Sequence, residues 1–456
     1  MARSLLLQTI SVAALNACLG TAAFGQAIIN GGGATSPQGD YAGANNPSTG
    51  APLSEFSTYN AAQSAVRFGT YYGVGSTGQT ALLNNDLTCD INKLTGNNGG
   101  LCSNTPGGPD TVHYAASDSV FTATQIGSWA TSTYGQAASG NLIQIPSLGT
   151  GETIVIDNTA ISKNGQLVLT DSDLCGVFSG KITNFNQLTL GTGSVTPTAG
   201  PITVVYRSDS SGATFILTNH LSAVCQTGAT GNSNIAFTAT TTFATLFPSG
   251  NVGAVIPQSI GEAGSSGVAN YLAGLTSAGT ITSAIGYVSP DWTSIPPAPA
   301  ALLSNGQTSP LVVAAIQNGK RAYLPTTTSI ELGLSHPLQG SNLTPPSTAA
   351  QGAQTSAWIP VIQQTSTGYP IVGYSTLDFA QCYATKAIST GLIAFLKLHY
   401  TNAAYTTIQA NNGLAQIANA GASKFLAAVQ KNILANKNGW QTDIGDKAVC
   451  GKLAGR

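Results

Sequence analysis

The chain has 456 residues, of which only 7% are charged, against about 25% in a typical globular protein. Its 16 basic and 17 acidic residues give a net charge near zero, which excludes a polybasic nucleic-acid-binding protein. The apolar content of 42% favours a folded chain over a disordered one, and the length favours two domains.

The first 27 residues have the pattern of a secretory signal peptide. Arg3 precedes an interrupted apolar run that ends in small residues, with cleavage expected after Gly25 or Ala27. The run is too short for a convincing membrane anchor. We therefore expect an exported protein, either periplasmic or secreted.

Six cysteines remain after removal of this segment, and an even number in an exported chain indicates disulfide bonds. Fifteen connectivities are open, and we favour pairing in sequence order, as Cys89–Cys102, Cys175–Cys225 and Cys382–Cys450. Because Cys-x-x-Cys is absent and the four histidines lie far apart in sequence, no metal site is predicted. No cofactor is predicted either.

The first strand pattern, residues 28–30, leads into three glycines, Gly31 to Gly33, and then into Thr35 and Ser36. The glycines permit a close approach of the backbone to a ligand. Thr35 offers a hydroxyl and an N–H group, and Ser36 offers at least an N–H group. Residues 38–65 are polar and are expected to include a helix.

Two further strand patterns end in polar turns. Residues 66–72 lead into Gly73-Val-Gly-Ser-Thr-Gly, which matches G-x-G-x-x-G but has no ribose-binding acid, so a dinucleotide site is not predicted. Within this motif, Ser76 is the residue of interest, because it offers a hydroxyl group at a strand-to-helix turn. Residues 112–116 lead into Ser-Asp118-Ser, which by itself is typical of a helix cap as well as of a ligand contact.

The fourth strand pattern, residues 202–206, enters the turn Arg207-Ser-Asp-Ser-Ser211-Gly212, after which helical apolar spacing resumes. Free N–H groups at a helix start attract anions, and the guanidinium of Arg207 can contact an oxyanion with two N–H groups. Ser211 adds a hydroxyl, and Gly212 allows close approach. The turn predicts a site for a small anion such as phosphate, while an ordinary polar turn that caps a helix stays equally open.

The second half of the chain is less informative. Residues 293–360 are rich in Pro, Ala, Thr and Ser with weak periodicity, and are interpreted as long loops on the first lobe of a two-lobed fold. Helical spacing is clear over residues 388–399 and 425–433. His399 ends an apolar stripe and is expected to be a packed helix residue rather than a ligand.

Several motifs in this order resemble the DING proteins, within the larger family of PstS-type periplasmic phosphate-binding proteins. The resemblance implies an α/β type II periplasmic-binding-protein fold with a ligand cleft between two lobes. The motifs are Asn30-Gly-Gly-Gly-Ala-Thr, Gly73-Val-Gly-Ser-Thr-Gly, Ala116-Ser-Asp-Ser, Leu174-Cys-Gly-Val-Phe-Ser-Gly, Val205-Tyr-Arg-Ser-Asp-Ser-Ser-Gly, Tyr369-Pro-Ile-Val-Gly-Tyr and Gln381-Cys-Tyr-Ala. The expected domains are 1–27 as signal peptide, 28–146 as the first part of lobe 1, 147–290 as lobe 2 and 291–456 as the second part of lobe 1.

The resemblance also implies a set of phosphate ligands. The family has threonine where this chain has Ala213, so one hydroxyl donor is lost unless Thr214 substitutes for it. Asp118 would accept the proton that phosphate carries and sulfate lacks, and would thereby exclude sulfate. The ligands carried over are Thr35, Ser36, Ser76, Asp118, Arg207, Ser211, Gly212 and Ala213, with Asp209 orienting the arginine.

The expected function is high-affinity binding of inorganic phosphate by hydrogen bonds, for ABC-type import or for extracellular scavenging. The expected partners are phosphate and an ABC permease, the protein is expected to be a monomer, and no catalytic residue is predicted. One alternative is a secreted phosphatase-like hydrolase with Ser211 or Ser76 as nucleophile, although no histidine for a general base falls in these motifs. The other is a surface or adhesive protein with a secondary phosphate pocket.

Overall fold

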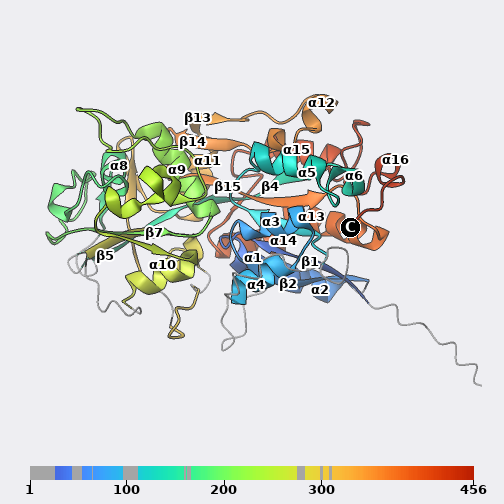
Figure 1. Cartoon of the computed structure of the whole chain (residues 1–456), viewed down its shortest axis with the longest axis horizontal. Coiled ribbons are helices and arrows are strands. Elements are labelled where there is room, and N and C mark those ends of the chain that lie inside the picture. Colours follow the sequence, from blue (N-terminus) through green and yellow to red (C-terminus); the bar gives the residue numbers. More distant parts are fainter. Residues whose placement is uncertain are drawn as a thin grey trace, which may run out of the picture.

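The structure is a computed structural model that describes residues 26–43, 54–63, 65–95, 111–158, 161, 166–274, 283–297, 301–307 and 311–456. Residues 1–25 of the expected signal peptide and Cys102 of the expected pair Cys89–Cys102 lie outside these ranges. Within them, no helix is both long enough and apolar enough to cross a membrane. Figure 1 shows the elements in two groups, with β5, β7, α8, α9 and α10 at the left and β1, β2, α2 and α13 at the right.

A six-stranded sheet organises the first lobe, in the order β16-β4-β15-β3-β1-β2. β1 pairs in parallel with β2 and β3, whereas β15 runs antiparallel to both β3 and β4. Its strands are β1 (Ala27–Gly33), β2 (Val66–Gly73), β3 (Tyr114–Ser117), β4 (Leu142–Gly151), β15 (Val372–Ala380) and β16 (Ala415–Gln416).

Helices cover this sheet with apolar and aromatic side chains. Phe56 stacks on Phe68 with ring centroids 4.1 Å apart, and Phe395 packs against both rings. The helices of this lobe are α1 (Gln38–Ala42), α2 (Glu55–Ala62), α3 (Thr77–Asn84), α4 (Thr88–Thr95), α5 (Ala123–Thr131), α6 (Gln136–Ser139), α11 (Thr327–Ser335), α12 (Ala349–Gly352), α13 (Lys386–Thr401), α14 (Ala403–Asn411), α15 (Ser423–Asn432) and α16 (Lys447–Cys450).

A five-stranded sheet organises the second lobe, in the order β10-β5-β9-β7-β8. Both faces of β7 are covered, because Val205 packs with Val268 and Leu272 of α10 while Val204 belongs to the core that includes Leu217 of α9. This explains the continuous β-branched run in the sequence. The elements are β5 (Thr153–Asn158), α8 (Asp171–Phe178), β7 (Thr203–Arg207), α9 (Gly212–Val224), β8 (Ser259–Glu262), α10 (Gly264–Leu272), β9 (Ser283–Val288) and β10 (Val312–Val313).

The chain changes sheets between β4 and β5, at Glu152. The interpretation of residues 293–360 as long loops on the first lobe is wrong in part, because β10 pairs with β5, and β11 (Ala315–Asn318) pairs with β6 (Val168–Leu169) and β12 (Arg321–Tyr323). The described part of this stretch contains short strands as well as the helices α11 and α12, and elements of so few residues leave little periodicity to detect. The expected lobe boundaries at 146/147 and 290/291 stay a prediction.

A hairpin of β13 (Pro337–Ser341) and β14 (Val361–Thr365) follows, and β14 docks on α9 of the second lobe. Asn219 donates to the carbonyl of Ile362 at 2.7 Å, and the ring of His220 lies 3.0 Å from the carbonyl of Gln363. The two lobes are therefore joined by more than the chain crossings.

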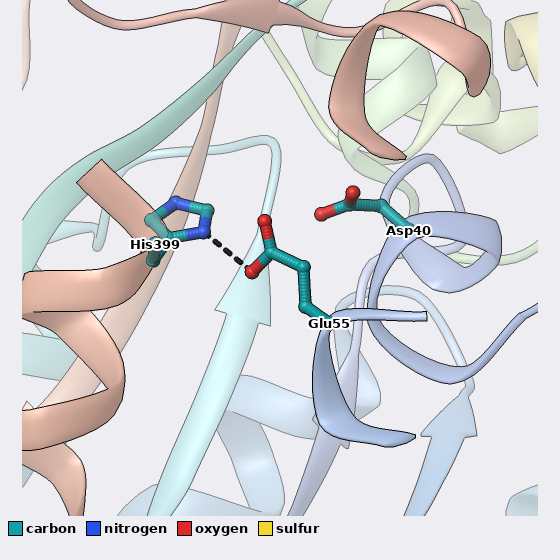
Figure 2. Close-up of side chains that lie close together, drawn as sticks. All are labelled: Asp40, Glu55 and His399. Carbon is teal, nitrogen blue, oxygen red and sulfur yellow. Dashed lines mark hydrogen bonds and ion pairs between the residues drawn. The ribbon is translucent and has the colours of Figure 1, made fainter. Parts of the chain in front are cut away.

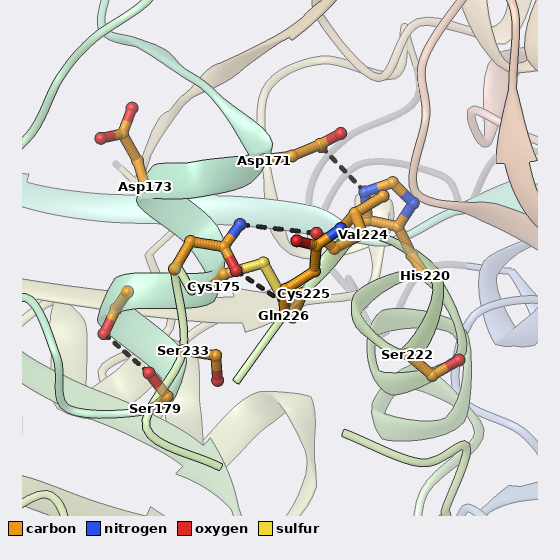
Figure 3. The surroundings of a disulfide bond; sticks show 12 residues. Asp171, Asp173, Cys175, Ser179, His220, Ser222, Val224, Cys225, Gln226 and Ser233 are labelled. Carbon is orange, nitrogen blue, oxygen red and sulfur yellow. Dashed lines mark hydrogen bonds and ion pairs between the residues drawn. A yellow bond between two sulfur atoms is a disulfide. The ribbon is translucent and has the colours of Figure 1, made fainter. Parts of the chain in front are cut away.

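Two of the three expected disulfide bonds are confirmed. Cys175 of α8 is bonded to Cys225 at the end of α9, and Cys382 is bonded to Cys450 of α16. Figure 3 shows the first of these bonds beside the pair formed by Asp171 and His220. Each bond closes a long stretch of chain, of 50 and 68 residues, within one lobe.

Candidate anion-binding site

Four strand ends place polar residues where the two lobes meet. The carboxyl ends of parallel strands share one edge of a sheet, so β1, β2 and β3 bring Ser36, Ser76 and Asp118 to the same edge of the first sheet. β7 ends in Arg207 on the second sheet, and α9 begins at Gly212. We call these five residues the interlobe site.

The two sides of the interlobe site are in contact. The N–H group of Ser76 donates to the carbonyl of Ser210 at 3.4 Å. A Cβ atom at Gly212 would lie 2.4 Å from the Cβ of Asp118, and one at Gly75 would lie 3.6 Å from Nη2 of Arg207. Glycine at position 212 is therefore required for the close approach of α9 to the first lobe, whereas the predicted approach of its backbone to a ligand stays a prediction.

Asp118 is a buried carboxylate with capacity to accept a further hydrogen bond. It is 4% exposed, and Oδ2 accepts from the hydroxyl of Ser36 at 2.9 Å. Among the described residues, Oδ1 has no hydrogen-bond partner. Burial raises the pKa of Asp118 to about 6, against the lowering effect of the nearby Ser36 and Ser375 hydroxyls and of the charge on Arg207. Near neutral pH this group is an ionised acceptor.

Arg207, from the second lobe, interacts electrostatically with Asp118 and has a fixed orientation. The side chain is 1% exposed, and Nε and Nη2 each donate to Asp209 at 2.7 Å. Nη1 donates to the hydroxyl of Ser265 at 3.1 Å. A guanidinium has five N–H groups, so these bonds leave two for other acceptors.

Asp209 is the residue that orients the arginine, as expected. Burial alone would raise the pKa of Asp209, but the hydrogen bond and charge of Arg207 lower it below its ordinary value. The N–H group of Gly264 also donates to Oδ1 of Asp209 at 3.0 Å. Asp209 thus holds the guanidinium of Arg207 in one orientation, so that its planar face of N–H groups is in place without a conformational search.

The N-terminus of α9 gives the other part of the site. Ser211 is the N-cap residue, and its hydroxyl accepts from the N–H group of Ala213 at 3.2 Å. Thr214 is fully buried, and its hydroxyl lies 2.8 Å from the hydroxyl of Tyr287. Because Thr214 is engaged in the core of the second lobe, it does not replace the hydroxyl that is missing at Ala213.

The remaining expected ligands lie on the first lobe. The hydroxyl of Ser76 is buried and has no hydrogen-bond partner among the described residues. Thr35 is half-buried and directly precedes Ser36 in the turn between β1 and α1. The three glycines before them serve β1 itself, since a Cβ atom at Gly31 would lie 2.2 Å from the carbonyl oxygen of Tyr114 on β3. They allow close strand packing rather than direct contact with a ligand.

Two buried carboxyl groups near the site escaped the sequence argument. Glu152 lies at the crossing from β4 to β5 and Asp291 follows β9, and both interact electrostatically with Arg207 and Asp118. Burial raises the pKa of Glu152 and raises that of Asp291 to about 7. In the sequence, each is only an acidic residue next to an apolar strand. Such residues are common at strand ends, so the pattern did not mark these two as part of a site.

The four histidines lie in other surroundings. His113 accepts a hydrogen bond from the N–H group of Asn30, and His220 pairs with Asp171 at 3.1 Å. His336 is exposed and contacts the carbonyl of Leu332, while His399 is buried in the first lobe. Over the described part of the chain, none of them forms a hydrogen bond with the interlobe site.

The site therefore combines one fixed guanidinium, a helix N-terminus and hydroxyl donors with one carboxylate acceptor. The donors match the oxygens of a small oxyanion. The carboxylate matches an oxyanion that still carries a proton to donate.

Comparison with known proteins gives consistent results. Residues 52–397 match the family model described as a PBP superfamily domain. The chain is 33% identical over 359 residues to "Alkaline phosphatase L" of Pseudomonas aeruginosa, covering 78% of this chain and 83% of that protein. It is 31% identical over 439 residues to a "Phosphate-binding protein" of an unknown prokaryotic organism, covering 92% and 98%.

Solved structures agree with these sequence matches. The crystal structure of a DING protein is 28% identical, with a TM-score of 0.68 and coverage of 94% of this chain and 99% of that one. A high-affinity periplasmic phosphate-binding protein, PfluDING, solved with bound phosphate, is 29% identical with a TM-score of 0.67, covering 94% and 99%.

Proposed function

The chain belongs to the PBP superfamily and, within it, to the DING and PstS-type phosphate-binding proteins, and from this premise we propose that it binds inorganic phosphate at the interlobe site. Binding would use hydrogen bonds alone. The proposed ligands are Thr35, Ser36, Ser76, Asp118, Arg207, Ser211, Gly212 and Ala213, with Asp209 positioning the arginine.

One observation carries the proposal. Asp118 and Arg207, one from each lobe, are both buried, and each keeps hydrogen-bonding capacity that the described residues do not use. A protonated oxyanion between them would donate to the carboxylate and accept from the guanidinium. An anion without a proton would instead place acceptor against acceptor, at about 1–3 kcal/mol or more for the buried charged group.

We propose binding without turnover, although some relatives are named alkaline phosphatase. A serine nucleophile needs a base within hydrogen-bond reach. The hydroxyl of Ser211 serves as a helix cap, and the histidines of the described chain have other partners. A phosphatase remains the alternative because Ser36 donates to Asp118, which is a serine–carboxylate pair.

Export is part of the proposal. The Cys175–Cys225 and Cys382–Cys450 bonds agree with an oxidising compartment, either the periplasm or the medium. There the protein would capture phosphate and, in the periplasm, deliver it as a monomer to an ABC permease.

The test is calorimetric titration of the phosphate-stripped mature chain with phosphate and then with sulfate. We expect one phosphate per chain and no heat from sulfate. A parallel assay with a chromogenic phosphate monoester should release no phosphate. Folded protein that gives no heat with phosphate would overturn the binding proposal, and steady release of phosphate would favour the hydrolase.

A further inference from the structure

A second buried cluster of ionisable groups lies within the first lobe, apart from the interlobe site. Asp40 comes from α1, Glu55 from the start of α2 and His399 from the last turn of α13. Figure 2 shows the three side chains pointing toward one another. Each is at most 1% exposed, and one ligand atom of each lies within 4.8 Å of the others. We call these three residues the first-lobe cluster.

The contacts around His399 fix the orientation of its ring. Nε2 lies 2.9 Å from the hydroxyl of Ser147, which can donate or accept, and 3.1 Å from the carbonyl oxygen of Ser147. Nδ1 lies 2.7 Å from Oε2 of Glu55. The other oxygen of Glu55 accepts from Nε2 of Gln409 at 2.7 Å. In either tautomer of His399, the short contact between Nδ1 and Oε2 needs a proton, or a cation that replaces it, between the two atoms.

Asp40 shows the same need more clearly. It is fully buried, and among the described residues neither of its carboxylate oxygens has a hydrogen-bond partner. Its oxygens point toward the carboxylate of Glu55 in Figure 2. Burial, and next the charge of Glu55, raises the pKa of Asp40, and burial lowers the pKa of His399. A buried carboxyl without a partner is unfavourable in either protonation state, because the ionised form lacks a cation and the neutral form lacks an acceptor.

We propose that Asp40, Glu55 and His399 bind a divalent metal ion, and that zinc fits them best. Two carboxylates balance the charge of the ion, and a neutral imidazole adds no charge. Imidazole nitrogen with carboxylate oxygen is a zinc donor set, and three protein ligands leave a fourth position for water. Ser147 and Gln409 already act as the outer partners that orient the ligands of such an ion.

The geometry needs only a small adjustment. Ligand atoms about 2.1 Å from a tetrahedral zinc ion lie about 3.4 Å apart. The contact between Nδ1 of His399 and Oε2 of Glu55 would therefore open by less than about 1 Å, while Asp40 moves inward from the far side. The ion would tie α1, α2 and α13 together, so its role would be structural.

The experiment uses the mature chain in phosphate-free buffer, stripped with a chelator and then titrated with zinc. We expect one zinc per chain and a rise in the thermal unfolding temperature that the chelator reverses. Asp40→Asn keeps the size of the side chain but removes its charge, and should weaken zinc binding at least 100-fold. Gln409→Ala removes only an outer partner, and should weaken it about 10- to 100-fold.

His336→Ala is the matched control, since His336 is exposed and lies outside the cluster. It should bind zinc as the parent does. Parent protein that binds no zinc, or whose unfolding temperature is the same with zinc and with chelator, would overturn the proposal and leave a protonated hydrogen-bond network. Equal zinc binding by Asp40→Asn and the parent would also overturn it. The parent titration decides the matter even if a variant fails to fold.

Discussion

The interlobe site and the first-lobe cluster are both buried groups of charged side chains, but they differ in what the chain supplies. The interlobe site contains its own cation, Arg207, held by two hydrogen bonds that it donates to Asp209. The first-lobe cluster contains two carboxyl groups and a histidine, whose Nδ1 faces Glu55 and whose Nε2 faces Ser147. One site has surplus donors, and the other has surplus acceptors.

This difference indicates the kind of ligand that each site can take. Buried groups keep their ordinary charge only when a partner compensates it. The spare N–H groups of an arginine fixed beside a helix N-terminus match the oxygens of an anion, whereas a cluster of lone pairs is compensated by protons or a metal cation. Two sites that are equally buried therefore favour opposite ligands: an anion where the chain supplies spare donors, and a cation where it supplies spare acceptors.

The largest effect should come from Arg207→Lys, which keeps the charge and removes the planar fork. Lysine cannot make two parallel bonds to Asp209 while it also faces the ligand. Disturbing a buried hydrogen-bonded charge pair costs about 2–5 kcal/mol. Phosphate binding should weaken about 30-fold to several thousandfold by calorimetry, while zinc binding at the first-lobe cluster stays unchanged.

The exposed Arg321 supplies the control for this substitution. Arg321→Lys should bind phosphate as the parent does. If Arg207→Lys also binds phosphate like the parent, the guanidinium is not a ligand and the assignment of the interlobe site is wrong.

The second effect is a dependence of stability on pH, measured by urea unfolding of the ligand-free chain between pH 4 and pH 8. The pKa of Asp118 is about 6 in the folded chain against an ordinary value of 3.8. Between these values the folded chain holds a proton that the unfolded chain has released, so stability falls as pH rises. The total fall from this group is on the order of 3 kcal/mol and is complete above about pH 6.

Asp118→Asn should remove the part of this pH-dependent loss of stability that comes from Asp118. The raised pKa values of Asp40 and Glu55 act in the same direction, so Asp40→Asn should also flatten the profile. Zinc should flatten it in the parent, because the metal replaces the protons. A profile that is unchanged in both variants would show that burial perturbs neither group.

The residues of the interlobe site could be singled out from the sequence because strand ends carry their polar groups in short contiguous turns, although their role as phosphate ligands stays a prediction. The run from Arg207 to Gly212 holds the cation, its orienting acid and the helix cap within six residues. The strand-to-helix pattern around Ser76 and the disulfide pairs Cys175–Cys225 and Cys382–Cys450 could be predicted for the same reason, since local pattern and chain order suffice for them.

The first-lobe cluster could not be found in this way. Asp40, Glu55 and His399 come from three helices, and His399 is more than 340 residues from Glu55. The argument against a metal site used only cysteine spacing and the separation of histidines, and carboxylates brought in by folding leave no such pattern. The expectation that His399 is a packed residue is correct as to burial, but it missed its partners.

The third effect concerns specificity at the interlobe site. Asp118→Asn replaces an acceptor by a group that can also donate, so phosphate should bind about 5- to 150-fold more weakly, corresponding to about 1–3 kcal/mol. Sulfate should give measurable heat for the first time. Asp40→Asn is the matched control, because it removes a buried carboxylate of the same lobe and should leave the phosphate and sulfate titrations unchanged. A variant at Asp118 that still rejects sulfate would show that another group enforces the selection.

The smallest effect tests whether a hydroxyl is missing at the N-terminus of α9. Ala213 is buried beside the cap residue Ser211. The family resemblance implies threonine at this position. Ala213→Thr should tighten phosphate binding about 2- to 10-fold, the range expected for one added hydrogen bond of about 0.5–1.5 kcal/mol. Thr214→Val should lower stability and leave affinity nearly unchanged, because that hydroxyl contacts Tyr287. If Thr214→Val instead weakened phosphate binding, the hydroxyl of Thr214, and not a group at position 213, would be the one that contacts phosphate.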